Sequence, residues 1–520
     1  MSFRFVTMLA LFAALIFSTM LNAQAVPPPP AEINGKSYEA WKKDIKNQDP
    51  SRRIVGMQTM LAFGVDKAYD ALPDIIGELK KHKNNPIDMS VRVNGMAVMT
   101  TILANKKKPD EKIVDEAFAI YKMFLKDEQV LVKTRAAQGI ACLGPAKAQE
   151  AITDVIAVAR NTSHTYQMRK DGLLALTAIA VDNKVVHAKV PGELRFALDD
   201  SASEVRMTAL NSMVVLNHFL AKDDKAACID KITGRLKAKK EDDPAMLIAG
   251  HGTIMSLSGD PPAANLAAVA KYLHEKDLLL RTQALGVINL FGPKAQGAID
   301  DIIAVAEKHP SDEFRKSALD TLLKMAYDKN GLHPKVPAAL RNALDDKVPE
   351  IRLTALQAIG PAKVGLDKAE RKLTIGKLNA FLAAEKEPML QMWAHAAIMT
   401  VAEQVTKDHV EPLVTMLGHK EVPVRLQALQ LIALCGKDAK PFALNAVVAL
   451  IKDPELTVGV AAIDALPRLR AFETTDMLKK IVADKDADPA LREAAQESLD
   501  DFDDIMTLER KKDKSDKKDK

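Results

Sequence analysis

Apolar residues along this chain recur at the spacing of short helices that come in pairs. In residues 335–361, KVPAALRNALDDKVPEIRLTALQAIGP, apolar positions repeat at helical spacing from Val336 to Leu344 and restart at Ile351. The polar stretch DDKVP separates the two helices, and Gly360-Pro361 ends the second. One such pair cannot bury its apolar faces alone and needs a similar pair on each side. The pattern therefore predicts an array of stacked helical hairpins.

The paired pattern recurs about thirteen times between residues 37 and 503 and predicts an all-α fold, an α-solenoid (superhelix) of about thirteen helical hairpins. The first helix of each hairpin is predicted, in chain order, at Tyr38–Lys46, Ala68–Lys81, Glu111–Lys126, Gln149–Arg160, Pro191–Leu198, Lys225–Lys237, Ala264–His274, Gln296–His309, Pro337–Leu344, Lys368–Ala383, His409–Leu417, Pro441–Ile451 and Thr475–Ala483.

The second helices share the motif Val-Arg-x-x-Ala-Leu. Aligned on its arginine, the chain has a small residue three positions later in every copy, which allows close approach of neighbouring helix backbones. These residues are Gly56, Gly95, Ala136, Gly172, Ala209, Ala249, Ala284, Ala318, Ala355, Ala394, Ala428, Ala461 and Ala495. The arginine occurs as Arg53, Arg92, Arg169, Arg206, Arg281, Arg315, Arg352, Arg425 and Arg492, and is replaced by Lys133, Met246, Gln391 and Val458.

The fuller motif, Asp-x-x-x-x-Val-Arg-x-x-Ala-Leu-x-x-Ile-Gly, resembles the HEAT repeat family and its lyase-type relatives. It is clearest from Asp346 to Gly360, and the Ala-Leu-Pro start of a first helix occurs at Ala71-Leu72-Pro73. The resemblance covers residues 37–503 and implies HEAT-type hairpins. In that family the turn Asp and the second-helix Arg bond between neighbouring repeats. By resemblance, Asp346 is expected to pair with Arg352, and Asp199 or Asp200 with Arg206, in a structural ladder whose other arginines are Arg92, Arg281, Arg315 and Arg425. A row of arginines for anionic ligands is the alternative.

A longer period lies above the hairpin repeat. Residues 187–210 match residues 333–356 at 15 of 24 positions, with an offset of 146. A block of four hairpins near 129–276 is therefore interpreted as duplicated at 277–420. On this interpretation, paired features such as His187 and His333 are inherited loop residues and do not mark a site.

The N-terminus has the pattern of an export signal. Arg4 precedes an apolar run from Val6 to Leu21, which is shorter than the ~20 residues of a membrane span. Ala23 and Ala25 then offer the small residues of a cleavage site. Residues 1–25 are thus predicted as a signal peptide and 26–36 as an extended proline-rich spacer. The expected location is periplasmic or extracellular with no transmembrane domain in the mature chain, and a retained membrane anchor is the alternative.

The composition of 48% apolar, 27% charged and 4% aromatic residues suits closely packed helices. The net charge of +4 comes from Arg4 and the tail Glu509–Lys520, so the repeat region is neutral and no nucleic-acid partner is expected. Residues 504–520 are predicted to be a charged, disordered tail. Cys142, Cys228 and Cys435 fall in separate hairpins, too far apart for disulfides, and are expected to be unpaired and mostly buried.

In HEAT proteins the second helices line the concave side, so the positions two and five after the Arg are predicted to face outward there. They are mostly neutral hydrogen-bonding residues, and the simplest interpretation is a solvated surface without a binding role. The sharper one is a groove for an extended protein segment or a saccharide, with Trp393 as an anchor. The candidate partner-binding residues are Gln138, Asn211, Gln283, Gln357, Trp393 and Gln427.

Sequence signals for catalysis fail individually. Gly35-Lys36-Ser37 has the end of a phosphate-binding loop, but Pro30 stands where that loop needs Gly. The Asp484-x-Asp486-x-Asp488 run lacks the Gly and Glu of a calcium loop. The one His-Glu pair, His274-Glu275, is too few for a di-iron hydroxylase of HEAT type. No catalytic residue, metal site or cofactor is therefore predicted.

These observations favour a non-enzymatic, exported scaffold that binds a protein or another macromolecule along a curved helical surface. Two alternatives stay open: a HEAT-like enzyme, such as a lyase that acts on a bound prosthetic group, and a structural component of the cell envelope.

Overall fold

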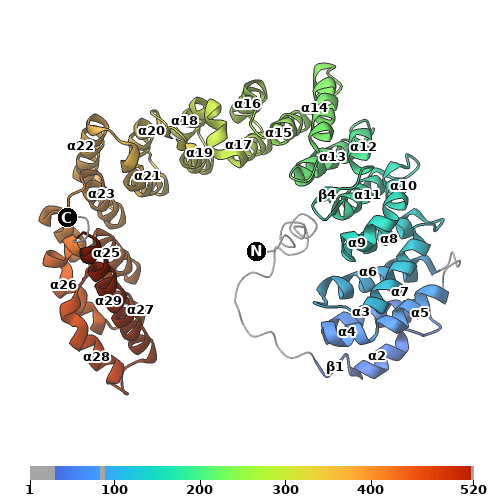
Figure 1. Ribbon diagram of the computed structural model, residues 1–520, viewed down its shortest axis with the longest axis horizontal. Coiled ribbons are helices and arrows are strands. Elements are labelled where there is room, and N and C mark those ends of the chain that lie inside the picture. Colours follow the sequence, from blue (N-terminus) through green and yellow to red (C-terminus); the bar gives the residue numbers. More distant parts are fainter. Residues whose placement is uncertain (1–29, 82–87, 517–520) are drawn as a thin grey trace. The chain divides into compact units, whose positions relative to one another are not determined.

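The computed structural model describes residues 30–81 and 88–516, and these form helical hairpins (Figure 1). The predicted signal peptide and the first residues of the spacer lie outside this part. The first helices are α2 (Tyr38–Asp44), α5 (Leu72–Lys81), α7 (Glu111–Phe124), α10 (Ile152–Arg160), α12 (Val190–Ala197), α14 (Lys222–Lys237), α16 (Ala263–Ala270), α18 (Ile299–Lys308), α20 (Val336–Ala343), α22 (Lys368–Ala384), α24 (Lys407–Met416), α26 (Lys440–Ala449) and α28 (Thr475–Ala483). Each overlaps its predicted range.

The second helices complete the thirteen hairpins of the described residues. They are α3 (Pro50–Met60), α6 (Met89–Asn105), α8 (Val130–Cys142), α11 (Tyr166–Ile179), α13 (Ser203–Leu216), α15 (Pro244–Ser258), α17 (Leu278–Phe291), α19 (Asp312–Met325), α21 (Pro349–Ala362), α23 (Pro388–Ala402), α25 (Val422–Cys435), α27 (Leu456–Arg468) and α29 (Pro489–Asp516). The connections add α4 (Val65–Asp70), α9 (Pro145–Ala148) and the 3-10 turns η1 (Leu61–Phe63), η3 (Gln149–Ala151), η4 (Lys271–His274), η5 (Gly292–Ala298), η6 (Lys363–Gly365), η7 (Gly436–Ala439), η8 (Leu450–Lys452) and η9 (Phe472–Thr474).

The hairpins form two compact units, residues 1–269 and 270–520. Within each unit, second helices pack against the second helices before and after them, as α8, α11 and α13 do in the first unit and α19, α21 and α23 in the second. First helices form the other layer, and the apolar side chains between the layers make the core. This is the all-α solenoid expected from the sequence.

Eleven of the thirteen predicted small residues of the second helices are buried. Ala209 and Ala355 are completely buried. A Cβ on Gly172 would lie 2.8 Å from backbone atoms of Ala159 in the preceding helix, and one on Gly56 would lie 2.9 Å from backbone atoms of Asp44 and Ile45. Glycine is therefore the residue that these two helix contacts can accommodate.

In two hairpins the predicted register of the small residue is off by one. Ala249 and Ala461 are only partly buried, whereas the next residues, Gly250 and Ala462, are buried. In both hairpins the motif arginine is missing, so the alignment had no fixed reference point.

Two β-hairpins between helices were not expected. Strands β3 (Val181–Asp182) and β4 (Val185–Val186) join α11 to α12, and β5 (Tyr327–Asp328) and β6 (Gly331–Leu332) join α19 to α20. Positive φ values at Asn183, Lys184 and Gly331 allow the tight turns. They occupy equivalent places in the two duplicated blocks.

The predictions for both ends of the repeat region need correction. Residues 32–36, predicted as part of the spacer, form with Ser37 a hairpin of β1 (Glu32–Ile33) and β2 (Lys36–Ser37). Asn34 and Gly35 adopt positive φ in its turn, and the Trp41 indole N–H donates to the Ile33 carbonyl at 2.9 Å. Residues 504–516, predicted as disordered, continue helix α29. Leu, Glu, Arg and Lys are good helix formers, and a helix already nucleated by packing extends without an apolar face.

Candidate functional site

The motif arginines join each hairpin to the next. Arg315 donates from Nε and Nη2 to the Asp346 carboxylate at 2.7 and 2.8 Å, and from Nη1 to the His309 carbonyl of its own turn at 2.8 Å. Arg169 and Asp200 repeat the arrangement at 2.6 and 2.7 Å. Burial alone would raise the pKa of Asp346, but hydrogen bonds from Arg315 and the Val348 N–H hold it below its usual value.

The acids predicted to pair with Arg206 and Arg352 were wrong, because the Asp200 and Asp346 carboxylates pair with the arginines of the preceding hairpins, Arg169 and Arg315. Arg92 pairs with Asp127 at 3.0 Å, Arg206 with Glu241 at 2.8 Å, Arg352 with Glu385 at 3.0 Å and Arg425 with Asp453 at 2.8 Å. Arg206 and Arg352 also donate to the backbone carbonyls of Asp200 and Asp346. We call these contacts the arginine–acid ladder.

At one predicted position, Arg281, the ladder has no acid among the residues that the structure describes. Arg281 donates to the turn carbonyls of Glu275 and Lys276, and its guanidinium lies 5.3 Å from the Phe314 ring centre. The following turn carries His309, whose Nδ1 accepts the Ser311 N–H. An imidazole can accept a backbone N–H and so stabilise the turn. It cannot neutralise Arg281 of the preceding hairpin as the Asp346 carboxylate neutralises Arg315.

The candidate partner-binding residues lie on second helices. Asn211 and Gln357 are exposed, while Gln138, Gln283, Trp393 and Gln427 are partly buried. Neighbouring members of these outward positions bond to one another, as Gln427 does to Gln430 at 3.3 Å. The amide row exists, but several of its side chains are already engaged.

Trp393 lies less open than an anchor residue would. Its ring packs against the core cluster of the last hairpins. Among the described residues, its buried Nε1 has no hydrogen-bond partner. Trp393 is therefore part of the packing between hairpins.

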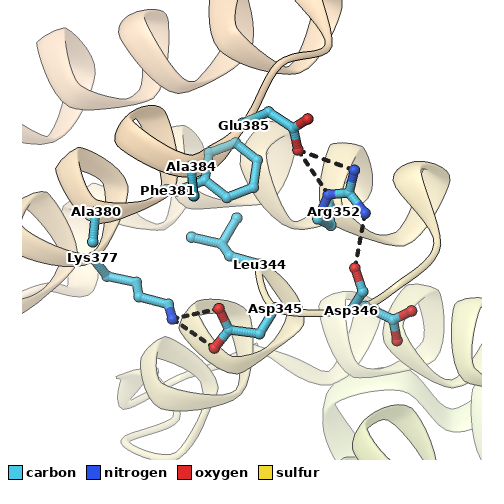
Figure 2. Close-up of a pocket in the computed structure, with 9 residues that line it drawn as sticks. All are labelled: Leu344, Asp345, Asp346, Arg352, Lys377, Ala380, Phe381, Ala384 and Glu385. Atoms are coloured by element: carbon cyan, nitrogen blue, oxygen red, sulfur yellow. Dashed lines mark hydrogen bonds and ion pairs between the residues drawn. The ribbon is translucent and has the colours of Figure 1, made fainter.

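A cavity of about 300 Å³ lies between α20–α21 and α22 (Figure 2). Two ion pairs border it: Lys377 with Asp345, and Arg352 with Glu385, the first at 2.5 Å and the second at 3.0 Å. Between them lie Phe381 and Leu344 (Figure 2). Backbone N–H groups of Glu387 and Lys386, together with Arg352, outweigh the effect of burial and keep the pKa of Glu385 below its usual value.

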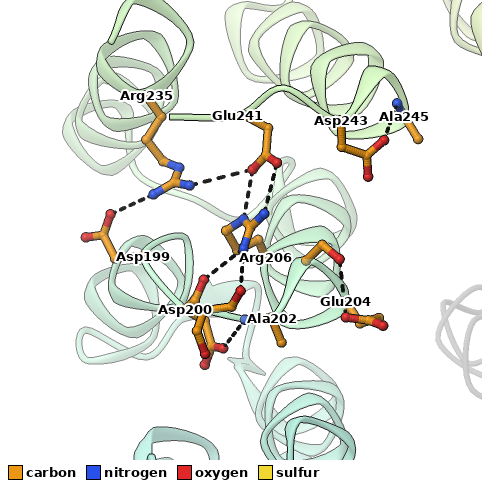
Figure 3. Close-up of polar contacts among 11 residues, drawn as sticks. Asp199, Asp200, Ala202, Glu204, Arg206, Arg235, Glu241, Asp243 and Ala245 are labelled. Carbon is orange, nitrogen blue, oxygen red and sulfur yellow. Dashed lines mark hydrogen bonds and ion pairs between the residues drawn. The ribbon is translucent and has the colours of Figure 1, made fainter. Parts of the chain in front are cut away.

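The duplicated block contains the same place with one difference. There Arg206 pairs with Glu241 (Figure 3), and Lys231 pairs with Asp199, as their counterparts do in the second block. Arg235 occupies the position equivalent to Phe381, and it lines, with Arg206 and Glu241, a separate small pocket of about 20 Å³ that does not reach Asp199. Extending the alignment of the two blocks beyond residue 210 would have revealed this exchange from the sequence.

The cysteines of the described residues are free thiols. Cys142, Cys228 and Cys435 are unpaired, as expected, and burial raises the pKa of the Cys142 thiol to about 12 and that of Cys435 to about 11. Within residues 30–81 and 88–516, no group of three or more His, Cys, Asp or Glu side chains could hold a metal ion. His187 and His333 each accept an N–H two residues later, from Lys189 and Lys335.

Comparisons with known proteins agree with the architecture. Residues 410–500 match the family model described as HEAT repeats. No curated protein matches the chain. The solved structure of Kap121p is similar over 88% of this chain and 56% of its own, with TM-score 0.53 and 14% identity. Karyopherin Kap121p bound to the extreme C-terminus of the protein phosphatase Cdc14p gives TM-score 0.54, 13% identity, and 88% and 57% coverage.

The chain spans little more than half the length of these karyopherins. At such identities the similarity concerns the fold alone. Together with the helical hairpins it defines the fold class: the chain is an all-α solenoid, of which residues 410–500 match the HEAT-repeat model. Among the described helices, none combines the length and the hydropathy that crossing a bilayer requires.

Proposed function

We propose that this protein is a non-enzymatic, exported scaffold that binds a protein partner along the outward faces of its second helices. The observation that carries the proposal is that neutral amide side chains recur at the equivalent position of three second helices, α13, α21 and α25. Asn211 presents one in the first unit, and Gln357 and Gln430 present two in the second, all exposed. An amide both donates and accepts, so a row of amides can pair with the backbone of an extended polypeptide.

The structural relatives support a protein as the partner. Their solved structures include Kap121p bound to the extreme C-terminus of a protein phosphatase and to Ste12p. The neutral charge of the repeat region favours a protein over a nucleic acid.

Export is proposed from the N-terminal sequence. Arg4, the apolar run Val6–Leu21 and the small residues Ala23 and Ala25 support a cleaved signal. Sequencing the N-terminus of the protein recovered from its own cells is expected to give Val26 as the first residue. A protein that retains Met1 and is recovered in the cytoplasmic fraction would contradict export. It would leave the proposal of partner binding unaffected.

Photo-crosslinking tests the binding face. A photoreactive amino acid is placed at Gln357 or Gln430, and a matched control is placed at Lys372, which is exposed on the first helix α22. We expect both second-helix positions to capture the same protein and Lys372 to capture none of it. Equal capture at all three positions would reject this face, and a chromophore retained by the purified protein would favour the lyase alternative.

A further inference from the structure

The two duplicated blocks, near residues 129–276 and 277–420, can be compared position by position. Four ion pairs recur in both: Arg169–Asp200 as Arg315–Asp346, Lys231–Asp199 as Lys377–Asp345, Arg206–Glu241 as Arg352–Glu385, and Arg195–Asp224 as Arg341–Glu370. Arg235 in the first block and Phe381 in the second stand at equivalent positions beside these shared ion pairs. Their equivalence follows from the offset of 146 that also relates Lys231 to Lys377.

In the first block, Arg235 bridges two carboxylates. Its Nη1 lies 3.0 Å from Asp199 and its Nη2 lies 3.6 Å from Glu241 (Figure 3). The two nitrogens of one planar guanidinium therefore reach both acids at once, which a single ammonium nitrogen cannot do in the same way. The Arg235 side chain thus lies between Asp199 and Glu241, at the place where the second block has the pocket beside Phe381.

In the second block, this guanidinium is missing. Among the ion pairs of the described residues, Asp345 has Lys377 and Glu385 has Arg352, whereas Asp199 and Glu241 each have Arg235 in addition. The space left open measures about 300 Å³, and Phe381 lines it between the two carboxylates (Figure 2). An aromatic face attracts a cation, and a guanidinium stacks on it particularly well.

We propose that this pocket, which we call the Phe381 pocket, receives an arginine side chain of a protein partner. The guanidinium lies over Phe381 and bridges Asp345 and Glu385, as Arg235 bridges Asp199 and Glu241. The partner residue thus supplies in trans what the first block supplies from its own chain. This inference rests on the proposed protein-binding function and adds the chemistry that the partner must present.

A short blocked peptide tests the pocket without knowledge of the partner. The probe is acetyl-Gly-Ser-Arg-Ser-Gly-amide at millimolar concentration, with the full chain, observed by saturation-transfer difference NMR on the arginine Cδ protons. The matched control peptide carries lysine in place of arginine. We expect a signal at the arginine side chain at least five times that at the lysine side chain. No arginine signal with the wild-type chain, or equal signals for the two peptides, would overturn the proposal.

Two exchanges between the blocks locate the binding. Phe381→Arg fills the pocket from within and is expected to reduce the arginine signal at least fivefold. Arg235→Phe opens the equivalent place in the first block and is expected to increase the signal about twofold. Each variant adopts the other block's own residue, and unchanged thermal melting confirms folding. A Phe381→Arg variant that is folded and retains the full signal would exclude this pocket.

Failure of this proposal and failure of the proposed function give different results. Crosslinking at Gln357 can succeed while the arginine peptide does not bind. That result would reject the pocket proposal alone. Conversely, the peptide can bind in a Phe381-dependent way while Gln357 and Gln430 capture no common partner. That result would reject the second-helix binding face and support the pocket.

Discussion

Arg315 donates from Nε and Nη2 to both carboxylate oxygens of Asp346, although the two residues belong to consecutive hairpins. Both side chains are less than one-tenth exposed. The same carboxylate accepts the Val348 N–H and so shapes its own turn. One aspartate therefore fixes the turn of its hairpin and attaches that hairpin to the one before it.

Replacing Arg315 is expected to destabilise the second unit. Arg315→Met leaves the buried Asp346 without the cation that pairs with it, and breaking a buried pair in this way costs about 3–5 kcal/mol. Urea denaturation followed by circular dichroism measures the loss. Arg281→Met is the matched control, because Arg281 contacts turn carbonyls and the Phe314 ring and forms no ion pair with any acid in the described part of the chain. Equal losses in the two variants would show that the ion pair contributes little.

Gly172 is expected to tolerate no side chain. In Gly172→Ala the new Cβ meets the Ala159 backbone at 2.8 Å, and overpacking of this kind costs about 1–3 kcal/mol. Gly376→Ala, also in a helix, is the control, since nothing lies within 4 Å of its Cβ position. There alanine is expected to stabilise by about 0.5–1 kcal/mol through helix propensity. Thermal melting that moves in the same direction for both variants would contradict the close-approach argument.

His395 is expected to make the last hairpins sensitive to acid. Burial, and then the neighbouring His409 at 2.9 Å between Nδ1 atoms, lowers the pKa of His395 to about 4. An unfolded histidine has a pKa near 6.5, so the unfolded chain binds the proton more readily. The stability that the neutral imidazole provides is therefore complete above pH 6.5 and is lost as the pH falls from 6.5 toward 4.

Thermal melting between pH 7.5 and 4.5 checks the contribution of His395. The melting temperature of the wild-type chain is expected to fall more steeply with pH than that of His395→Gln. Parallel pH profiles for the two proteins would assign the acid sensitivity to other groups.

The three cysteines are expected to resist thiol reagents in the folded protein. Burial raises the pKa of all three thiols, to about 12 for Cys142 and about 11 for Cys435. Few thiolates are then present at pH 8, and the thiolate is the species that reacts. Maleimide labelling with mass spectrometry should add no label to the native protein and three labels in denaturant. Rapid labelling of Cys435 without denaturant would show that its hairpin opens.

The candidate site could be read from the sequence only in part. The motif arginines were visible, but the partners of Arg206 and Arg352 were not, because Glu241 and Glu385 lie in loops of different length with no fixed spacing from the motif. Trp393 was read as an anchor from its outward register, yet its ring packs against the core. Whether a residue at the edge of a helix face is exposed or buried depends on the side chains of neighbouring helices. The apolar period of the helix itself does not specify these neighbours.

The sequence by itself determined the hairpin array. The 3.6-residue apolar period and the small residues Ala209 and Ala355 require helices that stack closely on like helices, because each hairpin has too little apolar surface to bury alone. Only the tertiary structure decided which carboxylates meet which arginines, and that the second block has a pocket beside Phe381 at the place where the first block has Arg235. Those relationships join residues about thirty positions apart through contacts between helices, and they depend on packing angles that no local pattern encodes.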